Sequence, residues 1–427
     1  MQASQRTEQN HALEFAVDKA DSMNEPLVVL FCLIDDFPEA NERHYKFMLE
    51  GLKEVDESLK KRRTTFVVKK GSPENIVPKI SDEASVLVTD RDYLKLQRRW
   101  RDNISKKVDI PFYQVESNVV VPVETASDKE EYAARTIRPK INDRMDEFLK
   151  IIDERTPKKG SMDIDFEGLD ISDMNRCMKK LDLKGEVKPV DDFKGGTSVA
   201  KSLLKDFIKN KLSDYPELSN DPTADNLSNM SPYLHFGQIS PVYIADEVMK
   251  SGSSGTEDYL EELIIRRELS MNYVFYNDNY DSLMGLPDWA METLKEHEKD
   301  EREYVYSLKE FEDAETHDPY WNAAQKEMIK TGKMHGHVRM YWGKKILEWS
   351  ETPEDAFLKA IKLNNRYELD GRDANAFTGV AWCFGKHDRA WKEIDIFGKV
   401  RYMNANGLKR KFDAEAYVDK VEEIEEL

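Results

Sequence analysis

Cysteine is scarce in this chain of 427 residues, which contains three. Cys32, Cys177 and Cys383 stand far apart, and no two of them form a C-x-x-C pair. A disulfide framework or a cysteine-rich zinc site would need a different number and spacing, so the sequence argues against both. Such sparse cysteine use is typical of proteins from a reducing compartment.

Long apolar stretches are also absent. The longest run, at residues 27–34, has eight residues, whereas a helix that spans a bilayer needs about 20. The segment from Met1 to His11 includes no apolar stretch of the kind that begins a secretory signal. We therefore expect a cytoplasmic protein with no membrane partner.

Basic residues are outnumbered by acidic ones. The chain has 64 Lys and Arg against 83 Asp and Glu, a formal net charge of -19 at pH 7. This balance argues against a general polyanion binder, so contact with nucleic acid would require a local basic patch. Glycine-rich phosphate motifs of the Walker and Rossmann types are missing, and no serine or cysteine stands in a nucleophile-elbow pattern.

Residues 1–122 alternate between short apolar runs and amphipathic stretches. Strands are expected at 27–34, 66–68 and 85–89, with helices between them and a final strand pair near Phe112 and Val119. Runs that are apolar on both faces and separated by helices indicate a parallel sheet covered on both sides. The sequence therefore predicts an α/β domain with a doubly wound, Rossmann-like parallel sheet.

The rest of the chain divides into two parts. Residues 123–198 are mixed in charge and rich in Pro and Gly, and no periodic pattern outlasts a helix at 142–152, which is typical of a long linker. Residues 199–427 are helical in pattern, with helix starts marked by Ser240-Pro241, Ser307-x-x-Glu310 and Thr352-Pro353. The sequence thus predicts an all-helical C-terminal domain.

Six of the seven tryptophans lie in the helical half. Trp342 and Trp349 stand at positions i and i+7 of a helix predicted at 333–349, so they share a face, roughly 10 Å apart. That separation suits electron hopping between indoles. Ordinary core packing is the alternative interpretation.

Two polar clusters stand beside apolar helical stretches. Residues 227–241 combine Ser and Asn with a helix start, where hydroxyls and backbone N–H groups can hold phosphates; helix capping by Ser228 or Ser231 is the simpler alternative. Residues 364–379 concentrate Asn, Asp and Arg. Because buried polar groups need partners, this second cluster predicts either a bound polar ring system or a solvated loop.

A local basic patch does occur, at residues 380–412. It holds eight bases against three acids, with aromatic residues between them. Cations for phosphates and flat rings for bases are what a groove for unstacked nucleotides needs, although a solvated surface is an equal alternative. Other charged patterns are weaker: His335 and His337 point to different helix faces, so no metal site is expected, and residues 261–268 are typical of surface ion pairing.

Five segments, in this order, carry a resemblance to a known family. They are Ser-Pro-Tyr-Leu-His-Phe-Gly-Gln-Ile-Ser at 231–240, Lys-Met-His-Gly-His-Val-Arg-Met-Tyr-Trp at 333–342, Ile-Leu-Glu-Trp at 346–349, Asp-Gly-Arg-Asp at 370–373 and Trp-Cys-Phe-Gly-Lys-His-Asp-Arg-Ala-Trp at 382–391. From residue 8 to 425 the chain resembles the class II cyclobutane pyrimidine dimer photolyases of the photolyase/cryptochrome family. The resemblance implies an antenna-binding α/β domain at 1–122, a linker at 123–198 and a helical domain at 199–427 that holds FAD in a U shape.

The resemblance also implies a set of flavin-binding residues. Those for the phosphates and the ribityl chain would be Tyr215, Leu227, Ser228, Asn229 and Ser231. Arg339 and Asp370 would form an ion pair that flanks the isoalloxazine ring, and Arg372 and Asp373 would continue its polar surround. Asn364 would face flavin N5 and stabilise the reduced ring.

Electron transfer and substrate binding have implied residues as well. The reduction chain would run from the flavin to the surface through Trp342, Trp321 and Trp349. Glu262 would hydrogen-bond the pyrimidine dimer, and Trp382 would stack on it once it is flipped out of the duplex. The residues that would grip the damaged DNA are Arg389, Trp391, Arg401, Arg266 and Arg267.

The N-terminus differs from the family pattern. Family members usually begin with a strand and a Tyr-Trp-Met segment before the Gln-Ala-Ser-Gln-Arg stretch, which here stands at 2–6. The resemblance therefore implies that the α/β domain lacks its first, central strand, either because the given start at Met1 is late or because the domain itself is altered. A second, antenna chromophore would be a deazaflavin or a folate, and its binding is the property that a missing strand affects most. We expect a monomer.

The implied function is light-dependent DNA repair, in which reduced, anionic FAD transfers an electron to a flipped-out cyclobutane dimer and the ring opens. Two other functions remain open. A cryptochrome-like photoreceptor would keep FAD and the tryptophans without repairing DNA, and a helical DNA-binding module would hold no flavin. The presence of Glu262 and Trp382 favours repair over the first, and the polar cluster at 364–375 favours it over the second.

Overall fold

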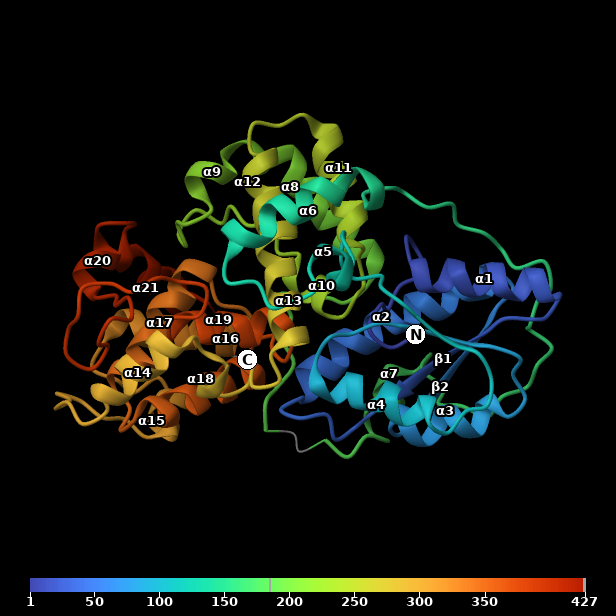
Figure 1. Ribbon diagram of the computed structural model, residues 1–427, viewed down its shortest axis with the longest axis horizontal. Coiled ribbons are helices and arrows are strands. Elements are labelled where there is room, and N and C mark those ends of the chain that lie inside the picture. Colours follow the sequence, from blue (N-terminus) through green and yellow to red (C-terminus); the bar gives the residue numbers. More distant parts are fainter. Residues whose placement is uncertain (184–185, 425–427) are drawn as a thin grey trace.

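The computed structural model describes residues 1–183 and 186–424. An α/β part occupies one side of the molecule, and a larger helical part occupies the other (Figure 1). The alternation predicted for the N-terminal part is confirmed. Its elements are α1 (His11–Met23), β1 (Val28–Leu33), α2 (Glu42–Lys61), β2 (Thr65–Lys70), α3 (Pro73–Ser81), β3 (Leu87–Asp90), α4 (Lys95–Ser105) and β4 (Phe112–Val115).

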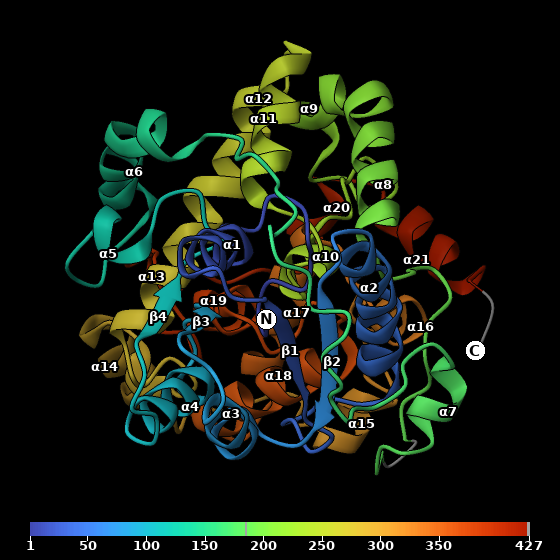
Figure 2. The ribbon, with the colours of Figure 1, turned by 90° about the vertical axis from the view of Figure 1, so that its right-hand side faces the viewer.

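The four strands form two sheets instead of one. β1 lies parallel to β2, with Val28 opposite Thr65, and β3 lies parallel to β4, with Leu87 opposite Phe112. Among the described residues these two pairs are not hydrogen-bonded to each other. The pairing is parallel as predicted, but the sheet is interrupted between β1 and β3, where the N-terminus lies (Figure 2).

A cavity of about 360 Å³ separates β1 from β3. Apolar side chains of both strands and of α1, α3 and α4 line it. Residues 1–3 lie at its edge: the Met1 ammonium group donates to the Leu30 carbonyl at 3.0 Å, and the N–H groups of Gln2 and Ala3 donate to the Asp90 carboxylate. The facing edges of β1 and β3 therefore border an apolar space.

The second strand of the final pair, expected near Val119, is not formed. Val119, Val120 and Val121 are buried in an irregular segment, and the N–H groups of Val120 and Val121 donate to the Glu268 carboxyl group. These donors are used by a side chain of the helical part, so they are not available to a neighbouring strand. The apolar run reflects burial between the two parts of the molecule and not a place in the sheet.

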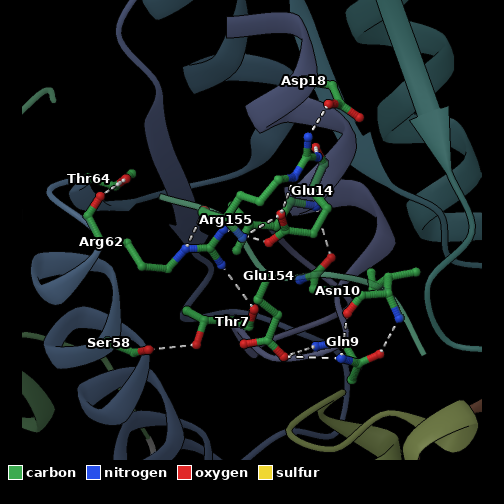
Figure 3. Close-up of polar contacts among 12 residues, drawn as sticks. Thr7, Gln9, Asn10, Glu14, Asp18, Ser58, Arg62, Thr64, Glu154 and Arg155 are labelled. Carbon is green, nitrogen blue, oxygen red and sulfur yellow. Dashed lines mark hydrogen bonds and ion pairs between the residues drawn. The ribbon is translucent and has the colours of Figure 1, made fainter. Parts of the chain in front are cut away.

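Residues 123–198 contain more structure than a free linker. They include α5 (Val123–Ala126), α6 (Ala134–Phe148) and α7 (Met174–Met178), so the helix expected at 142–152 begins and ends earlier. Between α6 and α7 the chain is tied to the N-terminal part (Figure 3). Arg155 Nη1 lies 2.5 Å from Asp18 Oδ1, and the Gln9 amide donates to Glu154 Oε1 at 3.2 Å.

The predicted all-helical C-terminal part is confirmed. Its longer helices are α8 (Thr197–Asn210), α11 (Pro241–Ser251), α13 (Arg267–Tyr276), α14 (Asp288–Glu296), α16 (Pro319–Thr331), α17 (Gly336–Glu348), α18 (Pro353–Tyr367), α19 (Ala374–Cys383) and α21 (Ala414–Glu422). Ser240, Ser307 and Thr352 cap their helices as predicted. Within the described ranges, every helix is too short or too polar to cross a bilayer.

Helix α2 joins the two parts of the molecule. Arg43 donates to the Tyr367 carbonyl at 2.8 Å, and the Asn41 amide donates to the Arg366 carbonyl at 2.7 Å. His44 Nδ1 accepts the Asn41 N–H, which leaves Nε2 to donate to the Glu368 carbonyl at 3.0 Å. The segment that follows α18 is therefore held in place by the N-terminal part.

Candidate functional site

Three buried tryptophans form a continuous row. Trp342 on α17 and Trp321 on α16 are stacked, with ring centroids 6.3 Å apart and planes 6° from parallel. Trp349, just after α17, lies 6.4 Å from Trp321. The Trp342 indole N–H donates to Gln325 Oε1, and that of Trp321 donates to the Trp342 carbonyl, so both rings are fixed. Trp321 thus bridges the pair that the sequence spacing indicates.

The row does not end in solvent at Trp349, which is only 3% exposed. Its ring centroid lies 4.8 Å from that of His317 and 5.9 Å from that of Tyr306. Tyr304, which is 37% exposed, stacks on His317 at 3.8 Å. The expectation that the tryptophans themselves run to the surface is therefore wrong, because two tyrosines and a histidine make the last contacts.

The Asn and Asp cluster after α18 is buried, so the solvated-loop interpretation is wrong. Asn364 is 1% exposed, Glu368 0% and Asp370 8%. The Asn364 amide donates to Asn365 Oδ1 at 3.4 Å. Buried polar side chains of this kind need hydrogen-bond partners.

Arg339 on α17 faces this cluster. Within the described residues its ion pair is with Glu368, at 3.7 Å from Nε to Oε1, and not with Asp370 as expected. Burial alone would lower the pKa of Arg339, but the attraction of Glu368 and Asp370 raises it above its ordinary value. Sequence reasoning missed Glu368, since the only signal for it was its place two residues before Asp370.

Asp370 gathers polar groups from three segments. Burial would raise the pKa of its carboxyl group, but Arg339, the Ser231 hydroxyl and Lys333 lower it below its ordinary value. Lys333 also donates to Asn229 Oδ1 at 2.7 Å. Four predicted cofactor residues therefore meet here, together with Lys333, which the prediction did not include.

Several polar atoms in this cluster have no hydrogen-bond partner within the described residues. They are Nε of Arg339, Oε2 of Glu368 and Oδ1 of Asp370. On the neighbouring helix α19, a Cβ added at Gly379 would meet no atom within 4 Å, although α19 packs against α13, α17 and α18. Buried polar atoms without a hydrogen-bond partner are what a polar ligand would satisfy.

The residues expected to hold phosphates stand at the start of α10 (Ser231–His235). Leu227, Ser228, Asn229 and Ser231 are all partly exposed. The helix-capping alternative is wrong, because the N-cap position is Met230 and no side chain caps this helix. Tyr215 packs edge-on against Tyr259 at 5.3 Å, and the Tyr259 hydroxyl interacts with Ser228, so two predicted ligands of the same group come together.

Glu262 and Arg266 lie on η2 (Glu261–Arg266), a π-helical turn that continues into α13. Such turns are frequent at functional sites. The Arg266 guanidinium lies 5.5 Å from the Trp382 ring, and its Nε lies 3.1 Å from Glu261 Oε1. Glu262 is exposed, yet desolvation by the surrounding protein raises the pKa of its carboxyl group.

Arg267 does not face DNA as expected. Its side chain is buried and donates to the Asn118 carbonyl at 2.7 Å, and burial lowers its pKa. Consecutive helical residues point about 100° apart, so Arg266 and Arg267 cannot share one surface. Arg267 instead attaches α13 to the irregular segment that follows β4.

The basic segment is exposed around Trp391. The guanidinium carbons of Arg401 and Arg389 lie 4.8 Å and 5.7 Å from the centroid of this ring, as cation–π contacts. Lys386 differs from them: it is buried, donates to the Gly285 carbonyl at 2.8 Å and pairs with Glu130. The predicted patch therefore keeps its exposed arginines and loses Lys386.

Arg372 and Asp373 are engaged elsewhere. Arg372 donates to the Asn365 carbonyl at 3.0 Å, and the Asp373 carboxylate accepts the N–H of Ala376 at the start of α19. Both line a second cavity, between the two parts of the molecule. Their role in the surround of a ring stays a prediction.

His335 and His337 stand at the start of α17. Nδ1 of His335 accepts the N–H of His337 at 3.2 Å, and burial lowers the pKa of His335 to about 3. The part of the chain that the structure describes contains no group of three or more His, Cys, Asp or Glu side chains that could hold a metal ion.

Comparison with known proteins identifies the family. The family model described as DNA photolyase matches residues 1–159. A deoxyribodipyrimidine photo-lyase from Methanothermobacter thermautotrophicus is 54% identical over 422 residues, which cover 99% of this chain and 93% of that protein. The chain belongs to the DNA photolyase family. Deoxyribodipyrimidine photo-lyases from Potorous tridactylus and Arabidopsis thaliana are 42% and 40% identical, cover 99% and 98% of this chain, and are themselves covered to 80% and 87%.

Solved structures of the photolyase/cryptochrome family share the fold. A cryptochrome from Synechocystis has a TM-score of 0.77 at 17% identity, over 97% of this chain and 86% of its own. An archaeal photolyase from Sulfolobus tokodaii, solved with two FAD molecules, has a TM-score of 0.75 at 18% identity, over 98% of this chain and 90% of its own. The photolyase fold, an α/β domain followed by a helical domain, is thus established for this chain.

Proposed function

We propose that this photolyase repairs cyclobutane pyrimidine dimers in DNA with light, as a class II member of the family. The observation that carries the proposal is the buried polar cluster of Asn364, Arg339 and Asp370, in which Arg339 Nε and Asp370 Oδ1 have no hydrogen-bond partner within the described residues. Relatives named deoxyribodipyrimidine photo-lyase, which match 99% of this chain, support the reaction.

FAD is the ligand that these residues fit. When bound, reduced FAD supplies the electron that light excites and that opens the cyclobutane ring. Arg339, in its ion pair, would flank the ring, and the Asn364 amide would offer the ring a hydrogen bond. The polar groups of Ser228, Asn229 and Ser231 would hold the rest of the molecule at the start of α10.

Glu262, Arg266 and Trp382 are suited to receive the damaged bases. Because the pKa of Glu262 is raised, it keeps a proton to higher pH than an ordinary glutamate and can donate a hydrogen bond to a pyrimidine carbonyl. Trp382 is partly exposed and offers a flat ring for stacking. Arg389, Trp391 and Arg401 would hold the DNA strand on the exposed basic segment.

The tryptophan row would serve reduction of the cofactor. Trp342, Trp321 and Trp349 are separated by contacts of 6.3 Å and 6.4 Å, which suits stepwise electron transfer inward. Tyr306, His317 and Tyr304 would extend this path to solvent.

An antenna chromophore, a deazaflavin or a folate, would bind the α/β domain. The interrupted sheet changes that domain most, so we expect antenna binding to be weaker than FAD binding. Extraction of the bound chromophores from purified protein measures both, and we expect a monomer in the same preparation.

A repair assay tests the proposed function. The purified protein, chemically reduced, is incubated with dimer-containing DNA in light and in darkness. Dimer loss in light alone supports the proposal, and equal loss in both rejects it. A yellow protein without repair in either would favour a cryptochrome-like photoreceptor, and a colourless protein that binds DNA would favour a module without flavin.

Substitution of Trp382 tests the substrate site separately. Trp382→Ala should weaken binding of dimer-containing DNA by about tenfold or more, because a stacked base contributes about 1–3 kcal/mol. Flavin content should not change. Met249→Ala, at an exposed position of α11, is the control and should leave both quantities as they are.

A further inference from the structure

Glu368 and Asp370 place two buried carboxyl groups against one guanidinium. Both side chains are more than nine-tenths buried. Oε1 of Glu368 lies 3.7 Å from Arg339 Nε and accepts the N–H of Met334 at 3.1 Å. Two ionised carboxylates in one buried position repel each other. Of the two cations near them, Lys333 donates to Asn229 Oδ1, and Arg339 is the one that lies within ion-pair distance of Glu368.

One oxygen of each carboxyl group lacks a donor. Within the described residues, Oε2 of Glu368 and Oδ1 of Asp370 have no hydrogen-bond partner. The two carboxyl groups nevertheless lie within hydrogen-bonding reach of each other. Two ionised carboxylates are acceptors only, so a hydrogen bond between these groups requires a proton on one of them.

The surroundings decide which group carries that proton. The charged and titratable side chains near Glu368 are Arg43 and His44 of α2, Lys333, Arg339 of α17, Asp370 and Tyr417 of α21. Burial and Asp370 raise the pKa of Glu368 well above its ordinary value, although Arg339 opposes them. Asp370 has its pKa lowered, since Arg339, Ser231 and Lys333 outweigh its burial.

We propose that Glu368 is a positioning residue that carries a proton and donates a hydrogen bond to the Asp370 carboxylate, so that the pair bears one negative charge, which Arg339 balances. The inference rests on the proposed function, because Arg339 and Asp370 are the residues proposed to flank the ring.

The consequence is electrostatic. A singly charged pair leaves the positive charge of Arg339 balanced within the protein, with no excess negative charge beside the ligand. An ionised Glu368 would add a second negative charge to a buried site that is proposed to hold an anionic ring. Glu368 therefore acts through Asp370 and Arg339, without contact with the substrate.

Infrared spectroscopy of the full chain tests the proton directly, whether or not flavin is bound. The wild-type minus Glu368→Gln difference spectrum at pH 7 should contain the carbonyl band of a protonated carboxylic acid. Glu292→Gln, at an exposed position of α14, is the control and should give no such band. A carboxylate band in place of the carbonyl band for Glu368 would overturn the proposal.

Two variants test the positioning role. Glu368→Gln keeps the shape and an N–H donor for Asp370, so flavin affinity and the reduction potential should stay close to wild type. Glu368→Ala leaves the Met334 N–H and Asp370 without this partner and should weaken flavin binding by about tenfold. Equal loss in both variants would mean that an ionised Glu368 is needed. If Glu368→Ala does not fold, Glu368→Gln alone still decides.

Flavin affinity measured over a pH series distinguishes the proposed role of Glu368 from a purely structural one, which would not make the affinity depend on its ionisation. In the wild type, flavin affinity should fall as the pH rises through the ionisation of Glu368, whereas the Glu368→Gln profile should stay flat there. Identical profiles would contradict the proposal. A colourless chain that still shows the carbonyl band would reject the proposed function and support the protonated Glu368. A yellow chain without the band would support flavin binding and reject the protonated Glu368.

Discussion

Trp321 joins Trp342 and Trp349 into one row of aromatic rings. The i, i+7 spacing of Trp342 and Trp349 was visible in the sequence, but the side chain that joins them comes from the preceding helix. Glu368 is a second example, because its ion-pair partner Arg339 also comes from another helix. At the scale of residues, spacing predicts partners on one helix and misses partners that packing supplies.

Trp342→Phe tests the row. Light-driven reduction of the bound flavin should slow by more than about tenfold, because the first relay is removed. Repair by enzyme that was chemically reduced beforehand should change little. Absorption spectroscopy of the flavin and a dimer-repair assay measure the two effects. Loss of both would count against the path, and Trp289→Phe, outside the row, is the control.

His387 should make the free energy of unfolding depend on pH in the acid range. Its Nδ1 lies 2.7 Å from the Tyr132 carbonyl, and burial lowers its pKa to about 4. The folded chain keeps this imidazole neutral where the unfolded chain protonates it. The contribution of His387 to the free energy of unfolding is therefore complete above about pH 6.5. It is lost as the pH falls towards 4, by about 3 kcal/mol in total.

Urea unfolding of the wild type and of His387→Asn between these pH values checks this expectation. The variant should lose less stability over the acid range than the wild type does. His297 is an informative control because hydrogen bonds to Asp300 and Glu393 raise its pKa. Its contribution is present at low pH and is lost as the pH rises, so His297→Asn should change the profile in the opposite direction.

At the scale of elements, the interrupted sheet is the main departure from the predicted fold. The Met1 ammonium group donates a hydrogen bond to the Leu30 carbonyl, and the Gln2 side-chain amide donates to the Cys32 carbonyl at 3.1 Å. The first residues therefore run parallel to β1. A segment added before Met1 in this direction would pass along the cavity between β1 and β3. The edges of these two strands face an apolar space instead of a neighbouring strand.

A designed extension tests whether a strand fits this cavity. An extension of about six Val and Ile residues, fused before Met1, should raise Tm by several degrees, since about 1 kcal/mol moves Tm by about 2–4 °C in domains of this size. It should also slow hydrogen exchange of the β1 and β3 amides. A Gly-Ser extension of equal length is the control, and equal Tm values for the two would contradict the expectation.

At the scale of the whole molecule, the charge is unevenly distributed. The chain carries a formal net charge of -19, yet Arg389 and Arg401 stand exposed around Trp391. An acidic protein binds DNA through such a local patch, and the rest of its surface repels the duplex. Affinity should therefore depend on few phosphate contacts and fall moderately with salt.

Arg401→Gln measures one of these contacts. The slope of log Kd against log salt should decrease by about one if Arg401 neutralises one phosphate. Binding of damaged and intact DNA should weaken equally, since phosphates carry no base information. Lys250→Gln, at an exposed position of α11, is the matched control. An unchanged slope for Arg401→Gln would remove this residue from the interface.

The sequence by itself determined the fold class, the order of the domains, the caps of the main helices and the basic segment, because periodicity, capping residues and local charge act over a few neighbouring positions. Only the tertiary structure decided that Arg267 and Lys386 are buried, that Val119 is not in a strand and that Glu368 takes the ion pair expected for Asp370. Burial and pairing depend on segments distant in sequence, such as α2 against the end of α18, and local patterns carry no information about such contacts.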